Sequence, residues 1–166
     1  MKTSLQSPKK IIKLSLIVCS LLFLGFYRDF VFKSINALLK AWDFNMDYAM
    51  PSSLRFMENY PYDTLLTLKW ILTFVFSLLY LIIALITIHL LFKNKNYLKI
   101  TIGTYIGITI FSGIFMLIGH YFQTTTDKMY EFARYFMGMA QSPIILMVLI
   151  PAFKLSEKEI TKSLSN

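Results

Sequence analysis

The sequence predicts an all-α membrane protein with four transmembrane helices, N-in/C-in, and an external amphipathic interfacial helix between the first two spans. Composition is the first reason: 56% of the 166 residues are hydrophobic and only 16% are charged, whereas about 25% are charged in a soluble protein. The second reason is that the apolar residues form four runs, each close to the roughly 20 residues that cross a bilayer. The third is that lysines gather beside these runs. We therefore expect one membrane domain over residues 1–166.

The expected spans have different internal features. The first contains Lys13, whose long stem can carry its charge to the headgroups. The fourth contains Pro143 and Pro151, which we expect to kink and then end the helix, because each removes a backbone donor. The spans are expected at residues 11–27, 70–92, 100–122 and 132–153, with an external segment at 28–69 and a cytoplasmic tail at 154–166.

The distribution of charge predicts the orientation. The N-terminal segment through Lys13 holds four lysines, the loop 93–99 holds three and no acid, and the tail 154–166 holds three against two glutamates. The segment 28–69 is balanced, with five basic and five acidic residues. Positive segments stay in the cytoplasm, so both termini are expected there. Because the net charge of +8 lies beside apolar runs, no nucleic-acid partner is expected.

The external segment 28–69 begins with an amphipathic pattern. Its apolar residues recur at spacings that place them on one face of a helix. This pattern predicts an interfacial helix lying on the outer leaflet, and packing of the same face on the transmembrane bundle is a compatible alternative. The residues are Val31, Ile35, Leu38, Leu39 and Trp42.

Polar residues in the fourth span suggest a partner-binding stripe. Arg134 and Gln141 are seven residues apart, which places them on one helix face about 10 Å apart. A buried glutamine in lipid needs a hydrogen-bonding partner, so this face should contact protein. Arg134 either turns inward to such a partner or extends outward to the membrane interface.

Small residues indicate where helices can approach closely. Gly103 and Gly107 form a G-x-x-x-G pair in the third span, and Gly138 and Ser142 repeat the spacing in the fourth. Such pairs favour helix packing, either within a chain or with a partner.

Catalytic and metal sites are not expected. The single cysteine, Cys19, lies in the middle of the first span, whereas His120 and Arg134 lie near the external surface. The difference in depth is about 12 Å from helix rise alone, so a Cys-His-Arg site is geometrically poor. His89 lies at the opposite side of the membrane from His120, which excludes a shared metal site. No catalytic residue and no cofactor are expected.

The stretch 133–153, ARYFMGMAQSPIILMVLIPAF, resembles the C-terminal region of small exosortase-associated integral membrane proteins of Bacteroidetes, of the exosortase X and exosortase F systems. The basic turn LFKNKNYLK at 91–99 is similar to theirs as well. The resemblance implies a non-enzymatic accessory protein of a protein-sorting system in a bacterial inner membrane.

Its expected partners are membrane lipids and an exosortase, itself an integral membrane protein. The chain would bind it through the third and fourth spans and the external segment. Two alternatives stay open: a minimal exosortase-like intramembrane cysteine protease or transpeptidase, and an oligomeric small transporter or channel subunit.

Overall fold

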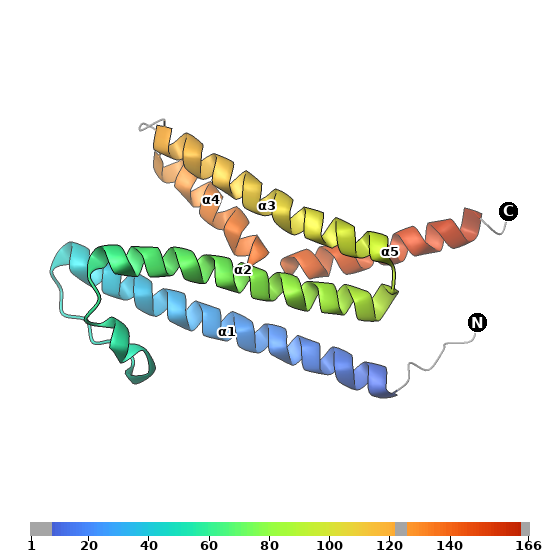
Figure 1. Ribbon diagram of the computed structural model, residues 1–166, viewed down its shortest axis with the longest axis horizontal. Coiled ribbons are helices and arrows are strands. Elements are labelled where there is room, and N and C mark those ends of the chain that lie inside the picture. The colour runs from blue at the N-terminus through green and yellow to red at the C-terminus, as the bar shows by residue number, and fades with distance from the viewer. Residues whose placement is uncertain (1–7, 122–125, 164–166) are drawn as a thin grey trace. The chain divides into compact units, whose positions relative to one another are not determined.

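A computed structural model describes residues 8–121 and 126–163 (Figure 1). Every regular element in these ranges is helical, and they contain no strand. The chain divides into two compact units, Met1–Phe76 and Ser77–Asn166, which we describe in turn. The elements are α1 (Pro8–Phe44), the 3-10 helix η1 (Ser52–Met57), α2 (Tyr62–Phe92), α3 (Lys95–Tyr121), α4 (Thr126–Ala140) and α5 (Ile144–Ser163).

Several of these helices are long and apolar enough to cross a membrane. In the described ranges, α1, α2 and α3 each meet this condition. The segments Glu131–Ala140 and Ile144–Glu159 meet it together, although they are bent by 59° at the break between them. The described ranges therefore contain three helices that could span a membrane, or four if the bent pair forms one span.

Helix α1 differs from the expectation of a short span followed by a separate interfacial helix. It is one continuous helix of 37 residues, or about 55 Å at 1.5 Å per residue. No proline occurs between Pro8 and Pro51, and neither Arg28 nor Asp29 prevents the hydrogen-bond ladder from continuing.

The end of α1 has a clear local cause. Asn45 adopts the left-handed conformation, with φ of 52°, which asparagine tolerates better than most residues. The Met46 N–H donates to the Ala41 carbonyl at 2.9 Å, and the Asn45 N–H donates to the Trp42 carbonyl at 3.5 Å. These two bonds form a Schellman motif, which satisfies the last carbonyls of the helix.

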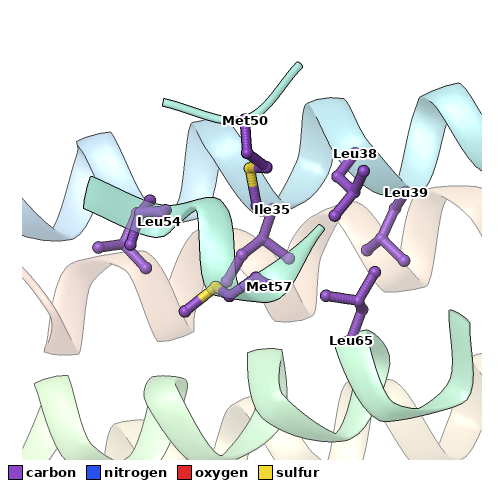
Figure 2. Packing of buried hydrophobic residues seen from close by; sticks show 8 residues of the cluster. Ile35, Leu38, Leu39, Met50, Leu54, Met57 and Leu65 are labelled. Carbon is purple, nitrogen blue, oxygen red and sulfur yellow. The ribbon is translucent and has the colours of Figure 1, made fainter. Parts of the chain in front are cut away.

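The apolar face predicted for the external helix packs against protein in unit 1 (Figure 2). Met50 and Met57 converge on Ile35, while Leu39 and Leu65 point toward each other. The expectation of an interfacial helix is therefore corrected, because this face is covered by η1 and by the start of α2. Trp42 does not join this core and is 51% exposed. The buried cluster comprises Val31, Ile35, Leu38, Leu39, Met50, Leu54, Met57 and Leu65.

Further along α1, aromatic rings contact α2 within the same unit. Phe76 of α2 is buried, and its ring centroid lies 6.4 Å from that of Tyr27 and 5.9 Å from that of Phe32. These contacts place Tyr27 and Phe32 of α1 at the same level along the helices as Phe76 of α2.

In unit 2, a tight turn joins α2 to α3. Lys93 has φ of 51°, and its N–H donates to the His89 carbonyl at 3.1 Å, which closes the C-terminus of α2. The Asn94 side-chain oxygen accepts a hydrogen bond from the Asn96 N–H at 2.9 Å. Asn94 is thus the N-cap of α3, and two residues suffice to reverse the chain.

Helix α4 lies beside α3 along the upper part of that helix (Figure 1). Ring centroids lie 5.0 Å apart for Phe111 and Phe136 and 5.9 Å apart for Phe115 and Phe132. Near these rings, the Ser112 hydroxyl donates to the Ala133 carbonyl at 2.7 Å.

Helix α5 returns to the opposite end of α3. The rings of Tyr97 and Phe153 stack with centroids 4.3 Å apart, and Phe92 meets Phe153 edge-on at 5.8 Å. From Phe115 to Tyr97, α3 covers 18 residues, or about 27 Å. The α4–α5 pair therefore contacts α3 at two places about 27 Å apart along that helix.

The prediction that Pro151 ends the fourth helix is wrong. Pro151 lies inside α5, which continues to Ser163. A proline removes one donor, the one that would serve the carbonyl four residues earlier. The remaining bonds of α5 continue beyond it, so part of the expected tail is helical.

Candidate functional site

The break between α4 and α5 is the most unusual backbone feature of unit 2. Helix α4 ends at Ala140 and α5 begins at Ile144. Pro143 has no N–H for the Met139 carbonyl, but the Ser142 hydroxyl donates to that carbonyl at 2.9 Å. The same oxygen accepts a hydrogen bond from the Ile144 N–H at 3.4 Å. A single hydroxyl thus serves both helix ends, a role that the small-residue pattern did not predict.

Gln141 fixes the break to α2. Its side chain is buried, and Nε2 donates to Ser77 Oγ at 3.3 Å. Ser77 Oγ in turn contacts Met137 Sδ at 4.0 Å. This bears on the expectation that Gln141 requires a hydrogen-bonding partner: the structure supplies one inside the chain. Ser77 was not singled out by sequence, because a lone serine in an apolar run carries no distinguishing pattern.

Two buried tyrosines lie on the helices beside the break. Tyr80 of α2 and Tyr105 of α3 are both almost fully buried. The Tyr105 hydroxyl has no hydrogen-bond partner within the described part of the chain. Tyr105 is eight residues from Tyr97 and seven from Ser112, so it lies between the two ends at which α3 contacts α5 and α4. A buried phenol normally finds a polar partner.

We call Ser77, Tyr80, Tyr105, Gln141 and Ser142 the break cluster. Its members are neutral donors and acceptors drawn from α2, α3 and the break. Such groups suit hydrogen bonding between helices in a water-poor interior. They do not include the paired nucleophile and base that covalent catalysis requires.

The structure gives Arg134 and Gln141 different surroundings. Arg134 is exposed on α4, whereas Gln141 is 3% exposed. The two residues therefore do not share one buried stripe. Arg134 is therefore directed away from the interior of the described chain.

Among the described residues, no atom packs closely against the glycines that were predicted to pack helices. A Cβ built on Gly103, Gly107 or Gly138 would meet nothing within 4 Å. Gly103 and Gly107 are exposed on α3, and Gly138 and Ser142 are half-buried. The G-x-x-x-G face of α3 therefore lies open.

An ion pair in α1 was not anticipated. Arg28 Nη1 lies 3.0 Å from Asp29 Oδ1, and the guanidinium lies 5.5 Å from the centroid of the Phe32 ring. Because the neighbouring rings of Tyr27 and Phe32 contact Phe76, the pair lies at the level of Phe76, about 9 Å along α2 from Trp70. The sequence signal was an arginine with an aromatic residue four positions later, a spacing that joins one helix face.

Metal and thiol chemistry receive no support from the described geometry. Across residues 8–121 and 126–163, no three His, Cys, Asp or Glu side chains are grouped as a metal ion requires. Cys19 is exposed on α1. The side chain of His120 lies outside the part of the chain that the structure describes.

Comparison with protein-family models, with curated proteins and with solved structures gives no match to this chain.

Proposed function

We propose that the protein crosses a bacterial inner membrane four times, with α4 and α5 together forming a broken fourth span and both termini in the cytoplasm. Helices α4 and α5 contact α3 at places about 27 Å apart along it, close to the roughly 30 Å of a bilayer core. A re-entrant loop would instead bring the end of α5 back to the level of Phe115. The lysine-rich segments then all lie in the cytoplasm, as the charge rule requires.

Within this topology, we propose a non-enzymatic accessory role in an exosortase-type protein-sorting system. The stretch 133–153 supplies the resemblance to exosortase-associated proteins. The observation that supports partner binding is the open surface at Gly103 and Gly107. In lipid, small residues let helix backbones approach closely, and this contact drives association where no hydrophobic effect operates.

Arg134 extends this proposed interface toward the external side. It is exposed near the middle of α4, about two turns before the break. An arginine so placed can pair with an acidic residue of a membrane partner, because its guanidinium binds carboxylates in a fixed geometry. The buried cluster around Ile35 in unit 1, on the external side in this topology, would form a second contact with the same partner.

Co-purification in mild detergent tests the proposal. A tagged exosortase co-expressed with the protein should retain it, and Gly107→Leu should reduce the retained fraction because the added side chain separates the helices. Gly113→Leu is the matched control: it also meets open space but lies on a different face of α3, about 120° away. Recovery of the protein alone, or equal losses in the two variants, would contradict the proposal.

A further inference from the structure

Two lysine-bearing segments that are distant in sequence meet at one end of unit 2. The stacked rings of Tyr97 and Phe153, with Phe92 edge-on, hold the α2–α3 turn against the middle of α5. Lys95 and Lys99 flank Tyr97, and Lys154 follows Phe153. In the sequence, these lysines served only to predict the orientation of the chain. The ring contacts bring the segments that carry them to the same end of unit 2.

The lysines face outward from this aromatic cluster. Tyr97 is buried, and Lys95 and Lys99 lie two positions to either side of it, on the opposite side of α3. Phe153 is also buried, while Lys154 and Lys158 are exposed one turn apart on α5. Each helix thus presents an exposed lysine pair at i and i+4, the spacing that brings side chains together on one face.

The balance of charge on this surface is positive. We define the lysine surface as Lys93, Lys95, Lys99, Lys154 and Lys158, all of which are exposed. Glu157 and Glu159 lie on the same part of α5, so five positive charges against two negative ones give +3. The first turn of α3 contains no acidic residue, and its N-terminal end adds further positive potential.

The depth of the lysine surface identifies the kind of anion that it meets. Lys93 directly follows the 23-residue apolar run that ends at Phe92. The ring contacts bring Lys154 to the same level. Lysines at the end of a membrane-spanning apolar run lie at the height of the lipid phosphates, and anionic lipids attract them by about 1 kcal/mol per residue.

We propose that the lysine surface binds the headgroups of anionic phospholipids on both sides of the aromatic cluster, at the end of unit 2 that the α2–α3 turn and α5 form. Phosphatidylglycerol or cardiolipin supplies the negative phosphate, and the acyl chains continue along the apolar surface below. The proposal requires that the helices span a membrane but does not depend on an exosortase partner. It can therefore hold if the accessory role fails.

Native mass spectrometry of the full-length protein in detergent tests this site. Phosphatidylglycerol and phosphatidylcholine with the same acyl chains are added in equal amounts, and the bound lipids are counted. The wild type should retain phosphatidylglycerol preferentially. Combining Lys95→Gln, Lys99→Gln and Lys154→Gln should lower that preference about tenfold or more. Raising the salt concentration should weaken it in the wild type, because screening acts on exposed charges.

Two matched variants separate site binding from general charge. Lys33→Gln, Lys40→Gln and Arg55→Gln remove the same charge from exposed positions of unit 1, and they should leave the preference unchanged. Changing Lys95, Lys99 and Lys154 to arginine should also preserve it, which shows that loss in the glutamine variant is not misfolding. Equal retention of the two lipids by the wild type would overturn the proposal. So would an equal loss of preference in the glutamine variant of the lysine surface and in the glutamine variant of unit 1. Displacement of bound lipid by a short RNA at equal concentration would also overturn it.

Discussion

At the scale of single residues, Ser142 shows how a helix can be interrupted within an apolar environment. A break leaves backbone donors and acceptors without helical partners, and inside a bilayer no water would replace them. The Ser142 hydroxyl donates toward α4 and accepts from α5. Pro143 directly precedes α5 and its carbonyl accepts from the Met147 N–H at 3.0 Å, while it has no N–H to be left without a partner at the break.

We expect Ser142→Ala to destabilise the protein by about 1 kcal/mol, because the capping bond to Ile144 and the bond to Met139 are both lost. Ser142→Thr keeps a hydroxyl in the same position and should stay close to the wild type. The free energy of unfolding, measured by titration with a denaturing detergent in mixed micelles, distinguishes the two. An alanine variant as stable as the wild type would remove Ser142 from this role.

At the scale of helices, the unbroken α1 provides one wall of a small core outside the expected first span. Ile35 is fully buried there, with Leu39 and Leu65 beside it and with Met50 and Met57 converging on it from opposite sides. Methionine side chains are flexible and fill irregular gaps. This core fixes the loop 45–61 against α1 and explains why a segment with no disulfide has a defined fold.

Ile35→Ala should cost about 2–5 kcal/mol, since truncating a buried aliphatic side chain loses contacts and leaves a cavity. Lys40→Ala, at an exposed position of the same helix, should change stability by no more than about 0.5 kcal/mol. Protease digestion of the loop 45–61 gives a direct readout: faster cleavage is expected for Ile35→Ala alone. Similar cleavage rates in both variants would show that the core does not hold the loop.

The helices and their approximate positions follow from sequence because apolar length is a strong, local signal. The kink expected from Pro143 coincides with the break, since a missing N–H acts wherever it occurs. The continuity of α1 was not predictable from periodicity, because its polar residues Arg28 and Asp29 resemble a span boundary. Only the contacts of Tyr27 and Phe32 with Phe76 reveal that the helix continues with α2 beside it.

The polar contacts of the candidate site were only partly predictable. The need of Gln141 for a partner follows from its chemistry, but the identity of Ser77 depends on how α2 is placed against the break. Likewise, G-x-x-x-G spacing does not say whether a helix meets its own chain or another. The open space at Gly103 and Gly107 is a property of the packed structure alone.

At the scale of the whole molecule, the proposed topology makes three surface positions report on the number of crossings. Removing the single cysteine by Cys19→Ala gives a background without thiols. In that background, Ser53→Cys should react with a membrane-impermeant maleimide added outside intact cells. Asn94→Cys and Lys158→Cys should react only after permeabilisation, because an even number of spans returns α5 to the cytoplasm. Outside labelling of Lys158→Cys would mean that α4–α5 is re-entrant.

The length of α1 fixes the height at which the core around Ile35 is held. Phe44, the last residue of this 37-residue helix, lies 12 residues beyond Phe32, or about 18 Å past the level of Phe76. Every residue inserted into such a rod raises that end by 1.5 Å and turns it by about 100°. Each insertion therefore changes both the height and the rotation of the core around Ile35. Only insertions close to a whole number of helical turns would keep the same face of this core toward a neighbouring protein.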